Sequence, residues 1–169
     1  MRHGALLLVV FVVGCGDAKV DKVWGDSRGV MRSASKIEFS WLDVPHPKEE
    51  PPGSKAPSAM NFDYWSWGIK SGPLTADAAA AKLVADVLLD EKSYYHGPPK
   101  ACLPMPGVML RFIDSNRIVK ILLCFECRMV MVRGPGGSES GGDFDPGAPA
   151  LIAAVKAAFP KDADVQKLQ

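Results

Sequence analysis

The sequence predicts an α+β domain in which an antiparallel sheet of about four strands carries two main helices on one face. Three observations predict this class. Apolar and polar residues alternate in several segments, two other segments have the spacing of amphipathic helices, and a short turn joins two of the strands as a hairpin. The chain has 169 residues, of which 47% are hydrophobic, enough for one modest domain with its own core.

The N-terminus has the features of a secretory signal peptide. Met1, Arg2 and His3 precede an apolar run at 4–13, which a small residue, Gly14, follows. This run is shorter than the roughly 20 residues that a transmembrane helix needs. We therefore expect residues 1–14 to be a targeting signal that is removed.

The four residues Val12-Val13-Gly14-Cys15 resemble the lipobox of bacterial lipoprotein precursors. The resemblance implies that Cys15 is lipidated and becomes the first residue of a protein anchored to a membrane of the cell envelope. The alternative is a cysteine that happens to follow an ordinary signal peptide. Loss of Arg2 leaves equal numbers of basic and acidic residues, and no basic run is present. This balance argues against nucleic-acid binding and leaves membrane attachment to the lipid.

Residues 15–35 are polar and without period, so we expect the lipidated cysteine to be followed by a flexible tether. A single domain is expected to span residues 36–169. Its first strand, 36–42, is predicted to be half-buried, with Ile37, Phe39 and Trp41 on one face. The proline-rich segment 45–58 is predicted to be an exposed loop.

An aromatic stretch, 61–69, is predicted to be a strand with Trp65, Trp67 and Ile69 on one face. Such aromatics could be exposed to bind a sugar or a peptide, but burial of both tryptophans in a small core is the favoured interpretation. The turn Ser71-Gly-Pro-Leu74 follows it.

Two helices are predicted. The first runs from about 75 to 91, with Thr75 as its N-cap and with Leu83 in the apolar stripe that faces the sheet. The second runs from 149 to 159 and begins with Pro149 in a favoured position. Between the hairpin and the second helix, the glycine-rich segment 134–148 lacks the Gly-Lys-Ser or Gly-Lys-Thr of a phosphate loop. It is predicted to be a flexible loop.

A hairpin is predicted at 107–133, with a first strand at 107–113, a turn at 114–117 and a long second strand at 118–133. If Ile113 faces Ile118, every apolar residue of the first strand lies on the apolar face of the second, which supports this register. The long strand contains the motif Cys124-Phe-Glu-Cys127.

Once Cys15 is used, three cysteines remain. On one continuous strand Cys124 and Cys127 point to opposite faces about 10 Å apart, beyond the range of a disulfide. A turn at Phe125-Glu126 would bring them together, but neither residue favours one. The hairpin register places Cys127 on the same face as Cys102. We therefore predict a disulfide between Cys102 and Cys127, worth about 3 kcal/mol, with Cys124 buried and free.

Two alternatives remain for these cysteines. His96, Cys102, Cys124 and Cys127 could form a closed tetrahedral zinc site, although an oxidising compartment disfavours it. A thiol-redox role is the other, although the pair is not at the start of a helix that would lower a thiol pKa. Arg128 after Cys127 excludes covalent haem attachment by the usual motif. No catalytic residues are predicted, and no cofactor unless the zinc site forms.

The segment from Cys102 to Cys127 resembles small bacterial proteins that carry a Cys-x-Pro segment followed by a hairpin ending in Cys-Phe-Glu-Cys. The resemblance implies one domain with three linked cysteines and no known activity. Some of those proteins carry Arg-His where this chain has Met105-Pro106, which weakens the zinc alternative. The expected function is a lipid-anchored, non-enzymatic envelope domain in binding or structure, with an envelope protein or a glycan as partner. The alternative is the zinc or thiol-redox site.

Overall fold

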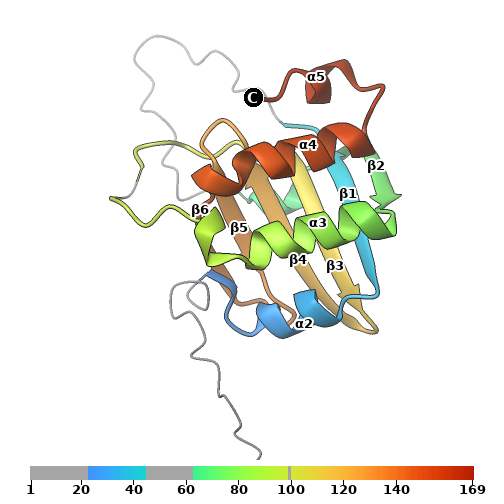
Figure 1. Cartoon of the computed structure of the whole chain (residues 1–169), viewed down its shortest axis with the longest axis vertical. Coiled ribbons are helices and arrows are strands. Elements are labelled where there is room, and N and C mark those ends of the chain that lie inside the picture. The colour runs from blue at the N-terminus through green and yellow to red at the C-terminus, as the bar shows by residue number, and fades with distance from the viewer. Residues whose placement is uncertain (1–22, 45–62, 99) are drawn as a thin grey trace, which may run out of the picture.

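The computed structural model of the chain describes residues 23–44, 63–98 and 100–169. The predicted signal peptide 1–14, the lipidation site Cys15 and the proline-rich loop 45–58 lie outside the described residues. The predicted α+β class with an antiparallel sheet is confirmed: Figure 1 shows one open sheet with helices laid across one of its faces. Within the described residues this sheet has six strands, not about four.

The strands follow the order β2-β1-β3-β4-β5-β6 across the sheet, and every neighbouring pair is antiparallel. The predicted hairpin register is confirmed, because Ile113 lies opposite Ile118. The strands are β1 Lys36–Leu42, β2 Ile69–Thr75, β3 Val108–Asp114, β4 Arg117–Cys124, β5 Met129–Arg133 and β6 Glu139–Asp143.

Four helices accompany the sheet in the described part of the chain, where two main ones were predicted. The longest two, α3 (Ala78–Leu89) and α4 (Ala148–Ala158), contact each other and cover the sheet. The shorter ones are α2 (Ser27–Ser33) and α5 (Ala163–Gln166). Single 3-10 turns lie at Tyr64–Ser66, Glu91–Ser93 and Asp145–Gly147.

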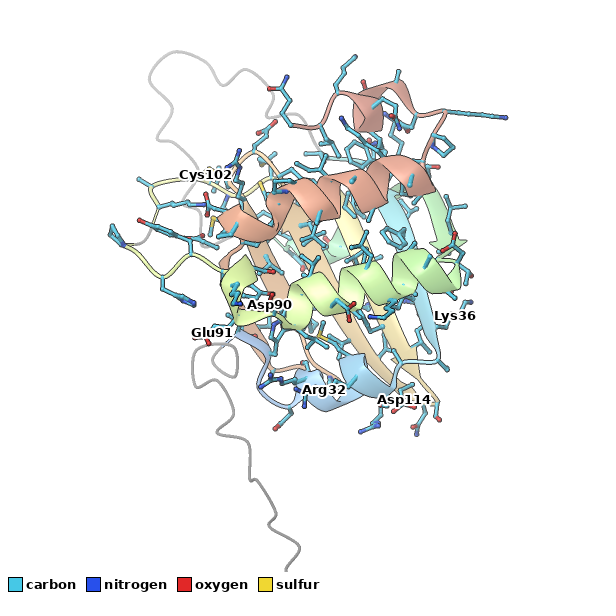
Figure 2. All side chains as sticks on the ribbon, viewed as in Figure 1. Arg32, Lys36, Asp90, Glu91, Cys102 and Asp114 are labelled. Atoms are coloured by element: carbon cyan, nitrogen blue, oxygen red, sulfur yellow. A yellow bond between two sulfur atoms is a disulfide. The ribbon has the colours of Figure 1, made fainter. Side chains whose placement is uncertain are left out.

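The prediction of a flexible tether is wrong for residues 23–33. Helix α2 contacts β3 and β4, and Trp24, Val30 and Met31 are buried beside it. The Trp24 ring meets that of Tyr94 edge-on at 6.2 Å. The hydroxyl of Ser33 donates to Asp114 over 2.7 Å. Figure 2 shows Asp114 at this end of the sheet, near α2. A seven-residue helix is too short to show a clear apolar period.

The predicted strand at 61–69 is wrong. Tyr64–Ser66 forms a 3-10 turn that Asp63 caps by accepting from the N–H of Trp65, at 3.2 Å. Trp65 and Trp67 are half-buried and lie outside the core, so their predicted burial is also wrong. The strand starts at Ile69 and includes the residues predicted as a turn, which an edge strand tolerates.

The second part of the 118–133 strand was also predicted wrongly. The chain leaves β4 after Cys124, turns through Phe125–Arg128 and returns as β5. Arg128 has a φ of 54°, in the left-handed region that closes such a turn. Phe125 and Cys127 are buried, so these turn residues continue the apolar alternation by coincidence and hide the turn from a period-two pattern.

The glycine-rich segment 134–148 is not a flexible loop, because it contains β6 and a 3-10 turn and leads into α4. A Cβ at Gly141 would lie 2.5 Å from the carbonyl oxygen of Val130 on the neighbouring strand. The absence of a side chain at Gly141 therefore lets β6 lie close to β5. The outer edge of β6 is covered by a bridge from Tyr95 to Asp143, which protects an otherwise exposed edge.

The remaining differences concern helix caps and burial. Asp77, not Thr75, caps α3, by accepting from the Ala80 N–H at 2.8 Å. Leu83 points away from the sheet and is 42% exposed. Strand β1 is buried on both faces, with Ser40 only 1% exposed, so its predicted half-burial is wrong. The helix starting near Pro149 is confirmed.

Candidate functional site

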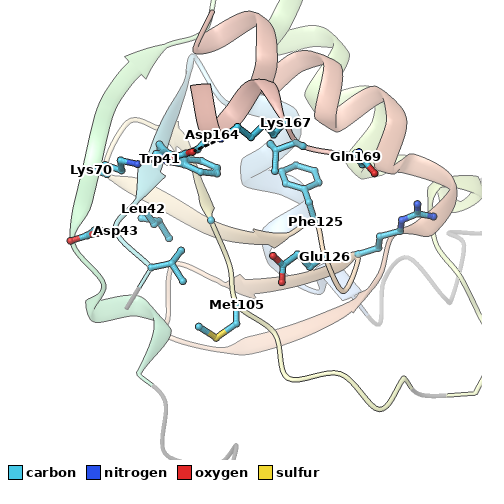
Figure 3. A pocket seen from close by; sticks show the side chains of 14 residues that line it. Trp41, Leu42, Asp43, Lys70, Met105, Phe125, Glu126, Asp164, Lys167 and Gln169 are labelled. Atoms are coloured by element: carbon cyan, nitrogen blue, oxygen red, sulfur yellow. Dashed lines mark hydrogen bonds and ion pairs between the residues drawn. The ribbon is translucent and has the colours of Figure 1, made fainter. Parts of the chain in front are cut away.

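An open cleft of about 960 Å³ lies at the end of the sheet where β1 finishes and the β4–β5 turn begins. Figure 3 shows side chains from distant parts of the chain converging on it. The lining comes from the end of β1, the start of β2, the segment before β3, the β4–β5 turn and the C-terminal tail. We call it the sheet-end cleft.

The floor of the sheet-end cleft is apolar. Trp41 and Phe125 are 9% and 5% exposed, so only a small part of each ring is open to the cleft. Met105 adds a flexible side chain to the lining. A Cβ at Gly107 would lie 3.1 Å from the Trp41 ring, so glycine lets the backbone approach that ring closely. The floor is therefore tightly packed from below.

One side of the cleft is closed by ion pairs. Lys70 of β2 donates to Asp164 of α5 at 2.9 Å, and Lys167 lies 3.3 Å from the same carboxylate. Hydrogen bonds from Lys70 and Lys167 hold the pKa of Asp164 below its usual value, and the hydrogen bond to Asp164 raises the pKa of Lys70. Both groups are solvent-exposed, so this contact positions α5 more than it stabilises the fold.

Glu126 and Arg128 from the β4–β5 turn also line the cleft. Figure 3 shows Glu126 on the side away from Lys70. Both turn residues are exposed, and neither side chain forms an ion pair with any described residue. They lie two residues apart on a tight turn. The rim therefore presents one anionic and one cationic group that are free to contact a partner.

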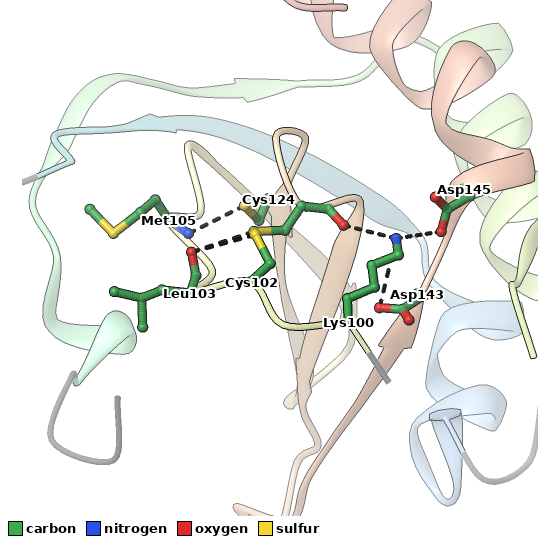
Figure 4. Close-up of a disulfide and its surroundings, with 8 residues drawn as sticks. Lys100, Cys102, Leu103, Met105, Cys124, Asp143 and Asp145 are labelled. Atoms are coloured by element: carbon green, nitrogen blue, oxygen red, sulfur yellow. Dashed lines mark hydrogen bonds and ion pairs between the residues drawn. A yellow bond between two sulfur atoms is a disulfide. The ribbon is translucent and has the colours of Figure 1, made fainter. Parts of the chain in front are cut away.

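Cys127 belongs to this turn, and Cys102 and Cys124 lie beside it (Figure 4). The sulfurs of Cys102 and Cys127 are at bonding distance and their Cα atoms are 6.0 Å apart, which is compatible with the predicted disulfide. The reasoning that led to this pair was partly wrong, because Cys127 lies in a turn and not on a strand paired with the Cys102 segment. Cys127 is buried and Cys102 is exposed.

Lys100 braces the same turn. Its Nζ donates to the carbonyl oxygen of Cys127 at 2.9 Å and to Asp145 at 2.5 Å, and lies 4.0 Å from Asp143 (Figure 4). A charged donor thus satisfies a carbonyl that no strand partner reaches. Sequence reasoning missed Lys100, since its partners are more than 25 residues away and no spacing pattern marks them.

Cys124 is the free cysteine. It is fully buried at the end of β4, and its sulfur accepts the N–H of Met105 at 3.2 Å. His96 is exposed, and the described residues contain no group of three or more His, Cys, Asp or Glu that could hold a metal ion. The structure pairs Cys102 with Cys127, so it does not bring the four proposed zinc ligands together.

The two aromatic candidates lie elsewhere. The Arg133 guanidinium lies 4.5 Å above the Trp65 ring, a cation–π distance. Trp67 meets Tyr64 edge-on at 5.3 Å, and burial raises the Tyr64 pKa above its usual value. Neither tryptophan lines the sheet-end cleft. Their rings are engaged by neighbouring side chains.

Comparison of the chain with protein-family models, with curated proteins and with solved structures found no match. Among the residues that the structure describes, none of the helices is both long and apolar enough to cross a bilayer.

Proposed function

We propose that the chain is a lipid-anchored, non-enzymatic domain of the bacterial cell envelope, and that it binds an envelope protein through the sheet-end cleft. The observation that supports this best is the rim formed by Glu126 and Arg128, two opposite charges without an ion-pair partner among the described residues, held on a turn beside an apolar floor. Complementary charges around an apolar centre are typical of specific protein interfaces.

The shape of the cleft favours a protein segment over a glycan. Glycans stack on open aromatic faces, whereas Trp41 and Phe125 are buried and expose little ring surface at the cleft floor. An apolar side chain of a partner fits such a floor, with one basic and one acidic neighbour facing Glu126 and Arg128. The brace from Lys100 and the cysteine pair hold the turn in place, which lowers the entropy cost of binding.

Site-specific crosslinking in the envelope tests the cleft. A photoreactive residue at position 126 or 128 should crosslink to one discrete protein, and the matched position Ala153, exposed on α4, should not. Reversing the charge with Arg128→Glu should remove the crosslink made from position 126. The proposal is contradicted if position 153 crosslinks as strongly as positions 126 and 128. It is also contradicted if Arg128→Glu leaves the crosslink from position 126 unchanged.

The lipid anchor rests on the lipobox resemblance and has its own test. Replacing Cys15 with Ser should move the protein from the membrane to the soluble fraction. Continued membrane fractionation of the Cys15→Ser protein contradicts lipidation. The cleft crosslink is scored separately, so the two parts of the proposal fail independently.

The second candidate is the thiol-redox or zinc site, which the buried free thiol of Cys124 beside the cysteine pair favours. Thiol titration of the denatured Cys15→Ser protein distinguishes a disulfide from a zinc site. One free thiol without reductant and three with it support the disulfide. Three free thiols together with stoichiometric zinc support the metal site.

A further inference from the structure

Five charged residues form a row across the sheet. The strand register pairs Glu38 with Arg111, Arg111 with Lys120, Lys120 with Arg133, and Arg133 with Glu139. Directly opposed residues of antiparallel strands point to the same face. The row therefore lies on one face, and its order is acid, base, base, base, acid.

This face is turned away from the helices. Phe112 and Val119, the neighbours of Arg111 and Lys120 along their strands, are fully buried in the core beneath α3 and α4. Successive residues of a strand alternate between faces. The side chains of Arg111 and Arg133 are 30% and 34% exposed, so a solute can reach them.

The two ends of the row are neutralised and its centre is not. Arg111 donates to Glu38 at 2.9 Å, and Arg133 donates to Glu139 at 2.5 Å. Lys120 forms no ion pair or hydrogen bond with a side chain in the described part of the chain. It stands between two arginines.

The position of Lys120 is electrostatically unfavourable. Neighbouring strands lie about 4.8 Å apart, and like charges directly opposite each other destabilise a sheet. Lys120 has an arginine opposite it on each side, and each arginine has one glutamate partner, so the row keeps one net positive charge at its centre. An anion bound over Lys120 would turn this repulsion into attraction.

Space for such an anion lies next to the row. A hollow of about 340 Å³ is lined by Lys120 and Arg133, together with Asn116 and the glycine-rich β5–β6 turn. The Trp65 ring packs against the Arg133 guanidinium and restricts its motion. The hollow is on a different part of the molecule from the sheet-end cleft, with which it shares no lining residue.

We propose that this cationic row is a binding site for a phosphate group, centred on Lys120. Lys120 and Arg133 line the hollow itself, and Arg111 lies opposite Lys120 on the next strand. A phosphate monoester offers three terminal oxygens to such donors, where a carboxylate offers two. Its charge also exceeds that of a carboxylate at neutral pH. The group could belong to a free phosphate or to a lipid headgroup, and the chemistry at Lys120 is the same.

Calorimetric titration of the Cys15→Ser full-length protein with inorganic phosphate at low salt tests the site. Saturable binding is expected. Lys120→Gln should weaken it at least about 10-fold, as expected for loss of a charge-assisted hydrogen bond. Lys161→Gln, an equal charge change at an exposed lysine distant in sequence, should leave the affinity unchanged. Non-saturating binding in this arm excludes a free phosphate as the ligand, and equal binding by both variants overturns the proposal.

Lys120→Glu separates loss of the site from loss of the fold. A carboxylate between two arginines should abolish phosphate binding while the melting temperature stays the same or rises. A variant that loses binding only because it unfolds would show a lower melting temperature, and Lys120→Gln then decides the outcome.

A second arm distinguishes the two sources. Vesicles of phosphatidylcholine with and without phosphatidic acid are sedimented with the protein. Binding that needs phosphatidic acid and Lys120 identifies a lipid headgroup, whereas calorimetric binding without vesicle binding identifies a soluble phosphate. Failure of both arms overturns the proposal, whatever the result for the sheet-end cleft.

Discussion

Removing the cysteine pair should cost the fold a large share of its stability. The perturbation is the double variant Cys102→Ala/Cys127→Ala. The two residues are separated by 25 positions, and the chain-entropy relation for a loop of this length gives about 3.5 kcal/mol at 25 °C. Domains of this size are typically stable by about 5–15 kcal/mol. The variant should still fold, since the contacts of Lys100 with Cys127 O and Asp145 use a backbone atom and a carboxylate.

Urea unfolding followed by tryptophan fluorescence measures this loss. With a denaturant slope of about 2 kcal/mol/M, the midpoint should fall by roughly 1.7 M. Reductant should lower the wild-type midpoint by a similar amount and leave that of the double variant unchanged. An unchanged midpoint in the variant, or a wild type that ignores reductant, would refute the reasoning that this pair closes the loop.

Three further predictions concern the core, a buried phenol and the charged row. Trp24→Ala should lower the free energy of unfolding by about 3–5 kcal/mol, because the side chain is only 1% exposed. A change near zero in urea unfolding would instead support a flexible tether at residues 23–33. Burial raises the pKa of Tyr94 in the folded protein, whereas the phenol of the unfolded chain keeps its usual pKa near 10. Above pH 10 the unfolded chain therefore loses this proton first. The free energy of unfolding then falls as pH rises, by up to about 1.4 kcal/mol per pH unit. Tyr94→Phe removes the 2.6 Å hydrogen bond to the Leu88 carbonyl, so it should be about 1 kcal/mol less stable than wild type near pH 7. This difference in stability should become smaller above pH 10, where only the wild type loses stability by ionisation of Tyr94. Parallel pH profiles of the two proteins would contradict this. Lys120→Glu should gain about 0.5–1 kcal/mol in urea unfolding at low salt and less at high salt, whereas a loss of stability would contradict the like-charge argument.

The hairpin shows where local patterns succeed. Strand β3 and the first half of β4 alternate between buried and partly exposed residues, so alternation and the turn at 114–117 together predict the pairing of Ile113 with Ile118. Alternation misleads seven residues later. Phe125 packs edge-on against Phe144 and Cys127 is paired with Cys102, so both are buried although they lie in a turn. Burial in a turn produces the same sequence pattern as burial in a strand.

Short or unusual elements escaped prediction for a similar reason. Helix α2 has seven residues, and strand β6 contains Gly141 and Gly142, which normally indicate a loop. Packing determines both elements. Trp24 is held against Tyr94, and Gly141 allows the Val130 carbonyl to approach closely. Neither contact has a signature in the local sequence.

The sequence alone determined the α+β class, the register of the central hairpin and the start of α4, since each depends on residues close together in the chain. Only the tertiary structure decided the sheet-end cleft and the cationic row. The cleft needs the C-terminal tail beside the β4–β5 turn. The row needs the order β1-β3-β4-β5-β6, which aligns Glu38, Arg111, Lys120, Arg133 and Glu139. Local periodicity reports which face a residue takes, but not which distant residue lies opposite it.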